Sequence, residues 1–366
     1  MSNARYFASL VNSNATLQPN LIINGDMAVS QRGTSETGIT STKYANAPDR
    51  WGVLIGALGT WTASQSTTAP DGFGYSYKLE CTTADASPAA GDYFALRQKI
   101  EGQNLQVLDS GSANAKKHTL SFWVRSSKTG TYNCEIHHVD GNVFNSIQYT
   151  VNTADTWERK TLTFDGYQTT AIANDNTEGY RVNWWLGGGS NYTSGTHNSN
   201  TWHSTAADRA VGNVNLADST SNEWYLTGVS LVVGDTAPVT HPYESYAENL
   251  QRCQRYYEQW NTVSGENVTI GTSYSGINPH CVLDMKVIKR AAPTVTLPPA
   301  GSTTGQIAFL TGTGSTPATV GTHSTDRLNT RSIRIGSSGY SGISSSVPSS
   351  LYAYGGSSSF KFDAEL

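Results

Sequence analysis

The chain has 366 residues, which is long for one domain and enough for two or three. Only 14% of the residues are charged and the formal net charge is −4, values that exclude a highly charged disordered chain and predict no surface for nucleic acid. No apolar stretch approaches the length of a membrane span, so we expect no membrane insertion.

Residues 1–19 have weak apolar periodicity and no clear core of their own. Segments of this kind usually become ordered only against a neighbour. We interpret residues 1–19 as an N-terminal docking arm, with a flexible tail as the alternative.

Apolar and polar side chains alternate along many short runs within residues 20–243. Leu120 and Phe122, for example, share one face of a predicted strand, while Trp123 lies on the other. Turn signals rich in Gly, Asp and Asn separate the runs. Alternation predicts antiparallel sheets with one buried face, and many such strands predict an all-β fold, a jelly-roll sandwich of two sheets.

Helical periodicity is convincing in residues 244–260, which we predict to be a linking helix. Ser245 and Glu248 form an S-x-x-E capping box at its start. The apolar positions are spaced 4-3-4-3 and make a two-heptad seam: Tyr246, Leu250, Cys253, Tyr257 and Trp260. This seam either packs on the chain's own domains or meets further copies around a threefold axis, as in a homotrimer.

Residues 261–366 return to short alternating strands, separated by Gly- and Ser-rich tracts, and are sufficient for a second small β-domain. Three tyrosines stand there among small polar residues: Tyr340, Tyr352 and Tyr354. Tyrosine provides contact area at low entropic cost, and the small Ser and Gly residues around it let a surface adapt to a ligand. These tyrosines are therefore candidates for ligand contact.

The sequence offers little for catalysis, metals or cofactors. The four cysteines lack C-x-x-C spacing, and we expect buried free thiols rather than a zinc site: Cys81, Cys134, Cys253 and Cys281. Nothing pairs the carboxylates Glu135, Asp140, Asp175 or Glu178 for glycoside hydrolysis. Asp140 and Asp175 are interpreted as turn residues, with calcium binding as the alternative. We predict no enzyme activity, no cofactor and no metal.

Binding is better supported than catalysis, because sugars stack on aromatic rings and pair with planar polar groups. Trp123 and Trp185 lie on the opposite parity from their core neighbours, and Arg181 accompanies Trp185. Tyr192 and Trp202 lie in a long polar loop, where recognition is often built. These residues are candidates for glycan contact. For the two strand tryptophans, burial between protomers or against a second sheet is favoured over ligand contact.

Several segments resemble known families. The N-L-I-I-N-G sequence at 20–25 and the strand at 224–233 are similar to β-sandwich carbohydrate-binding modules, and D-R-W at 49–51 resembles the phage versions. Thr227 stands where those modules often place an acidic residue, which argues against their structural calcium site. The helix at 251–257, together with R-A-A-P-T near residue 290, resembles tailed-phage structural proteins.

The resemblance implies a virion component, made in the bacterial host cytoplasm: a homotrimeric tail fibre that recognises host-surface polysaccharide or another envelope receptor. Residues 1–19 would bind adaptor or nozzle proteins of the tail, and residues 261–366, at the far end of the chain, are expected to form the host-facing tip. A capsid decoration or head fibre protein is the alternative, followed by a polysaccharide depolymerase.

Overall fold

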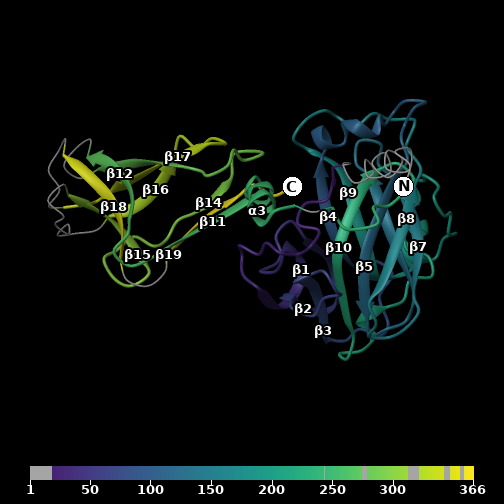
Figure 1. Ribbon diagram of the computed structural model, residues 1–366. Coiled ribbons are helices and arrows are strands. Elements are labelled where there is room, and N and C mark those ends of the chain that lie inside the picture. Colours follow the sequence, from purple (N-terminus) through teal and green to yellow (C-terminus); the bar gives the residue numbers. More distant parts are fainter. Residues whose placement is uncertain (1–18, 243, 274–277, 312–320, 342–346, 355–357) are drawn as a thin grey trace, which may run out of the picture. The chain divides into compact units, whose positions relative to one another are not determined.

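The chain folds into two compact units (Figure 1). The computed structural model describes residues 19–242, 244–273, 278–311, 321–341, 347–354 and 358–366. The first unit ends at Asn249 and also includes Leu366, and the second covers Leu250–Glu365. The division falls inside the predicted linking segment, whereas residues 1–18 of the predicted docking arm lie outside the described residues.

The strands described in the first unit are hydrogen-bonded in one continuous ten-stranded sheet, which folds into the two antiparallel layers of a sandwich, each of which we call a sheet. The first sheet runs in the order β4 (Tyr93–Glu101), β9 (Glu178–Gly188), β6 (Gly130–His138) and β7 (Val143–Val151). The second sheet runs in the order β3 (Ser76–Thr83), β10 (Glu223–Val233), β5 (His118–Ser126) and β8 (Glu158–Phe164).

One long strand, β2 (Gly52–Ser66), belongs to both sheets and also pairs with β1 (Ser35–Tyr44). Its residues 52–57 pair with β4, and its residues 60–66 pair with β3. Between the two halves, Ala57 and Gly59 have φ angles of 56° and 70°, so the strand bends there. A strand that switches sheets at a bend closes one side of the sandwich.

The core lies between the two sheets, as the alternation predicts. Leu120 and Phe122 of β5 are fully buried, and the Phe122 ring packs edge-to-face on Trp184 of β9 at 5.7 Å. The prediction of an all-β jelly-roll sandwich is confirmed. The expectation of one wet face is wrong for β6, because Asn133 and Glu135 on its outer face are also fully buried.

Residues 189–222, which we call the covering segment, bury that outer face. The segment contains α2 (Ser190–Thr193) and the short 3-10 helices η4 (Ala206–Asp208) and η5 (Leu216–Asp218). Two further 3-10 turns, η2 (Gly102–Asn104) and η3 (Gln106–Leu108), follow β4. Backbone hydrogen bonds tie the covering segment to the sheet at Phe144 with His203, and at Thr131 with Val214.

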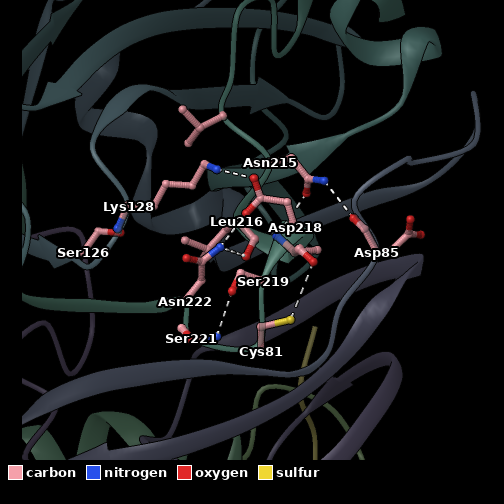
Figure 2. Close-up of polar contacts among 12 residues, drawn as sticks. Cys81, Asp85, Ser126, Lys128, Asn215, Leu216, Asp218, Ser219, Ser221 and Asn222 are labelled. Carbon is pink, nitrogen blue, oxygen red and sulfur yellow. Dashed lines mark hydrogen bonds and ion pairs between the residues drawn. The ribbon is translucent and has the colours of Figure 1, made fainter.

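A polar cluster fastens the C-terminal end of the covering segment (Figure 2). Asn215 accepts a hydrogen bond from the Ala217 amide at 3.0 Å and donates one to the Asp85 carbonyl at 2.8 Å. Asp218 pairs with Lys128 and accepts a hydrogen bond from the Asn222 side chain. The segment is therefore fixed at this end to the β-strand framework.

The N-G and D-R-W sequences meet in one hydrogen-bonded cluster. The Asn24 amide donates to the carbonyls of Val29 and Asp49 at 2.8 and 2.9 Å, and the Trp51 indole donates to the Asn24 carbonyl at 3.0 Å. A Cβ at Gly25 would overlap the carbonyl oxygen of Val229 in β10. These motifs thus serve the packing of the sandwich.

The linking helix is shorter than predicted. The capping box is confirmed, because Ser245 and Glu248 bond reciprocally, and α3 spans Tyr246–Gln254. The helical assignment of Tyr257 and Trp260 is wrong, since both lie in β11 (Tyr257–Thr262), which pairs along its length with β19 (Ser358–Asp363). The helical spacing is outweighed by the backbone pairing of β11 with β19 and by a buried ion pair between Glu258 of β11 and Lys289, which precedes β14.

The seam predicted on this helix is therefore not one continuous face. Tyr246 is 60% exposed, Leu250 is half-buried, and Cys253 and Tyr257 are buried. Trp260 packs on Phe362 at a ring distance of 5.4 Å within the second unit. The homotrimer remains a prediction.

The second unit is the small β-domain that the sequence predicts. A three-stranded sheet has the order β11, β19 and β14 (Thr294–Thr296). A six-stranded sheet has the order β15 (Gln306–Thr311), β18 (Pro348–Tyr354), β12 (Asn267–Ser273), β13 (Pro279–Asp284), β17 (Ser332–Ser338) and β16 (Thr322–Asp326). All four cysteines of the chain are buried free thiols, as expected.

Candidate functional site

A cavity of about 180 Å³ opens on the outer face of the first sheet. The lining residues come from β2, β4, β9 and the covering segment: Leu54, Tyr93, Arg97, Arg181, Asn183, Trp185, Tyr192 and Arg209. This lining contains three guanidinium groups and no carboxylate.

Strand register brings the polar residues of the cavity into rows across the sheet. Arg97 of β4 is the partner of Asn183 of β9, which in turn is the partner of Glu135 of β6. Arg181 of β9 is likewise the cross-strand partner of Lys99 of β4. Because side chains alternate along a strand, these residues all project from the outer face, away from the core.

A buried ion pair forms one wall of the site. Glu135 is fully buried and accepts two hydrogen bonds from Arg209, at 2.7 and 2.8 Å, and one from the Asn183 amide at 2.7 Å. Burial opposes ionisation of Glu135, yet the charge and hydrogen bonds of Arg209 and Asn183 keep the pKa of this carboxyl below its usual value. Glu135 is thus a fully engaged carboxylate and is unsuited to act as a general acid.

Arg209 also holds the covering segment against the sheet. Its guanidinium lies over three aromatic rings, at 4.0 Å from Phe144, 5.0 Å from Trp185 and 5.9 Å from Tyr192. The Ser146 hydroxyl donates to the Arg209 carbonyl at 2.9 Å. These contacts fix the position of the Tyr192 ring beside the cavity.

Three aromatic rings border the cavity on the same side. Trp185 is 1% exposed and tilts against Tyr192 at 5.4 Å, and Tyr192 meets Tyr93 edge-on at 5.5 Å. Trp185 is thus buried by its own chain, whereas Tyr93 and Tyr192 are only half-buried. The two tyrosines are the rings that a ligand can reach.

The three cavity arginines differ in their partners. Arg209 pairs with Glu135, and Arg181 forms a two-bond pair with Glu178. Arg97 forms no ion pair within the described residues, and its Nε is buried without a hydrogen-bond partner. Burial first, and then the nearby Arg181, lower the pKa of Arg97.

The structure brings together three of the residues predicted for glycan contact: Trp185, Arg181 and Tyr192. Trp123 lies apart, on the outer face of the second sheet, and Phe73 and Trp123 both approach Gly228 there. Trp202 is also outside the cavity. It packs on Tyr167 at 5.2 Å, and its indole donates to the Asp165 carbonyl at 2.9 Å.

The prediction of Tyr340 as a surface contact is wrong. Tyr340 is 1% exposed, and its hydroxyl accepts a hydrogen bond from the Phe309 amide at 3.0 Å, because the ring belongs to the core of the second unit. Tyr352 and Tyr354 are half-buried and meet edge-on at 5.0 Å on β18.

Sequence reasoning missed five lining residues: Leu54, Tyr93, Arg97, Asn183 and Arg209. The alternation of β4, with buried Phe94 and Leu96, was a signal that Tyr93 and Arg97 share its other face. No local signal joins Arg209 to Glu135, because 74 positions separate them.

The other carboxylates considered for catalysis or metal binding have structural roles. Asp140 accepts a hydrogen bond from the Ala173 amide at 3.2 Å, and Asp175 accepts two from Thr177. Within the described ranges, no group of three or more His, Cys, Asp or Glu side chains is placed to hold a metal ion. Within the same ranges, the chain contains no helix of the length and apolarity required to span a bilayer.

Solved structures with similar folds come from a phage and from bacteria. The enzymatically active domain of tailspike protein 4 of bacteriophage CBA120 is 12% identical, with 58% of this chain and 21% of that chain covered and a TM-score of 0.30. A family 11 carbohydrate-binding module of Clostridium thermocellum is 8% identical, with 56% and 99% covered and a TM-score of 0.28.

A third similar structure is the N-terminal cellulose-binding domain of β-1,4-glucanase C from Cellulomonas fimi, at 12% identity, with 57% and 100% covered and a TM-score of 0.27. The present chain thus spans about a fifth of the tailspike chain. At these identities the likeness concerns the fold. No protein-family model and no curated protein sequence matches the chain.

Proposed function

We propose that the first unit binds a glycan, with one sugar residue in the cavity beside Tyr93 and Tyr192. The observation that carries this proposal is the combination of two reachable tyrosine rings with an amide and guanidinium groups around one cavity. Aromatic rings accept the C–H faces of a sugar, and planar polar groups pair with its hydroxyls.

The size of the cavity agrees with a single sugar residue. Its volume of about 180 Å³ is below the ~300–1,000 Å³ of pockets for drug-sized ligands. The remaining sugars of a longer glycan would then lie outside, on the exposed surface around the cavity. Binding without catalysis is proposed, because Glu135 and Glu178 are both engaged by cations.

At the level of the whole protein we propose a virion structural role, as a tail fibre that contacts host-surface glycan. The support is the resemblance of the sequence at 251–257, together with R-A-A-P-T near residue 290, to tailed-phage structural proteins. A homotrimer, docking through residues 1–19 and a host-facing tip at 261–366 belong to this proposal. We propose the first unit for the glycan contact itself, because that unit contains the cavity.

A glycan array probed with the labelled full chain tests binding. We expect the wild type to bind a defined subset of glycans and Tyr192→Ala to weaken that binding by about tenfold or more. Tyr75→Ala is the matched control, because Tyr75 is 39% exposed and does not line the cavity. Absence of binding, or equal loss in both variants, would contradict the proposal.

The virion role has a separate test. Negative-stain images of virions labelled with an antibody to residues 261–366 should show label on the tail. Label confined to the capsid would instead support a head fibre or decoration protein.

A further inference from the structure

We propose that the cavity selects acidic glycans, with the anionic group of one sugar residue paired to Arg97. This inference deepens the proposed function and rests on it. The observations concern the balance of charge around the cavity, the missing partner of Arg97 and an unpaired acceptor beside it.

The charged groups of the site do not balance. Four cations line the cavity or flank its lining residues: Arg97, Lys99, Arg181 and Arg209. Two carboxylates pair with them, because Glu135 binds Arg209 while Glu178 binds both Arg181 and Lys99, the latter at 3.4 Å. Lys99 also donates to the Leu366 oxygen at 2.7 Å, so Arg97 is the cation of the four that forms no ion pair within the described residues.

Arg97 is held in place while the Nε atom of its guanidinium has no hydrogen-bond acceptor among the described residues. It lies on β4, which pairs on both sides, with β2 and with β9. Its Nε is buried and donates to no atom of the described residues. A buried polar group without a partner is costly, so a site that keeps one in position is prepared for a ligand that supplies the acceptor.

The neighbour of Arg97 indicates a sugar rather than a simple anion. Asn183 is the cross-strand partner of Arg97, and its Oδ1 is buried without a hydrogen-bond donor. The amide cannot turn over without losing its bond to Glu135 at 2.7 Å. A hydroxyl can donate to Asn183 Oδ1 while an anionic oxygen accepts from Arg97. Acidic sugars carry both groups on one ring.

Matched glycan pairs provide the test. The full chain is titrated with the acidic glycans of an array and with their neutral counterparts: carboxyl-reduced forms of uronate and sialate glycans, and desulfated or dephosphorylated forms of the others. Sodium sulfate serves as the simple anion. We expect the wild type to bind an acidic glycan at least tenfold more tightly than its neutral counterpart and more tightly than sulfate.

Arg97→Gln is the informative variant. Because Arg97 is largely buried and forms no ion pair within the described residues, this variant should fold with an unchanged or higher melting temperature. It should bind the acidic glycan about 10- to 100-fold more weakly, a much larger loss than the one for its neutral counterpart. The control Arg327→Gln removes the same charge from an exposed site in the second unit and should change neither affinity.

The outcomes separate this inference from the proposed function. Preference for neutral glycans, lost in Tyr192→Ala, would overturn the acidic selectivity while supporting glycan binding. Equal acidic binding in the wild type and Arg97→Gln would also overturn it. No binding to any glycan would overturn both proposals. The class of acidic glycan that binds identifies the anion as carboxylate, sulfate or phosphate.

Discussion

Glu135→Gln is expected to destabilise the first unit and to loosen its cavity. The substitution keeps the shape of the side chain and removes its charge, so Arg209 is left over the outer face of the sheet without a counter-ion. Glu135 is fully buried and Arg209 is largely buried, so water compensates little.

The expected loss is about 3 kcal/mol, the lower end of the ~3–5 kcal/mol for breaking a buried ion pair, because Gln retains one neutral acceptor. Replacing both partners, as Glu135→Leu with Arg209→Met, should recover most of that stability, since no charge is then left buried. The same double variant should still bind glycan poorly, because Tyr192 loses the cation that holds its ring.

The sign of the pH dependence follows from the depressed pKa of Glu135. The contribution of Glu135 to the free energy of unfolding is fully present above the pKa of the unfolded state, ~4.3. It is lost as the pH falls through the pKa of the folded state, which is lower. The difference in unfolding free energy between the wild type and Glu135→Gln should therefore be constant at neutral pH. Below about pH 4 it should shrink.

Urea denaturation followed by tryptophan fluorescence measures this effect. Of the nine tryptophans only Trp260 belongs to the second unit, so the signal reports mainly the first. Asp326→Asn, which breaks an exposed pair with Arg334 in the second unit, should leave the measured free energy of unfolding nearly unchanged. A loss below about 1 kcal/mol in Glu135→Gln, or one that persists unchanged at low pH, would refute the reasoning.

Three further predictions concern stability and assembly. Burial lowers the pKa of His118 to about 4, so the stability of the wild type should fall as the pH drops from ~6.5 towards 4. His118→Phe should flatten that decline, and an unchanged slope would contradict this prediction. Gly25→Ala should cost about 1–3 kcal/mol by overlap with Val229, against a near-neutral Gly74→Ala control in urea titrations. Leu250→Asp should dissociate the proposed trimer in light scattering, and a monomeric wild type would end that idea.

The sandwich could be predicted from the sequence because alternation is local. The period-two runs identify β5, β6 and β9 and their core faces, and the structure confirms them at Phe122 and Trp184. Local spacing failed where pairing decided the outcome. Tyr257 continues the helical seam by sequence, but six register pairs with β19 place it in a strand.

The site was only partly predictable, since its geometry comes from non-local pairing. The alternation of side chains along β9 showed that Trp185 points away from the core. It did not show that Trp185 is buried on the other face, under Arg209 of the covering segment. Alternation puts Glu135 on the face of β6 that was expected to be wet, and its pairing with the same arginine explains why it is buried. The unpaired state of Arg97 depends on which carboxylates reach its neighbours, which no spacing rule describes.

The most direct measurement is a crystal structure of the full chain soaked with a glycan that the array identifies. The account predicts one sugar residue in the cavity, with its ring against Tyr192, a hydroxyl donating to Asn183 Oδ1 and an anionic oxygen bonded to Arg97. A glycan bound elsewhere on either unit, with this cavity empty, would contradict the assignment of the site.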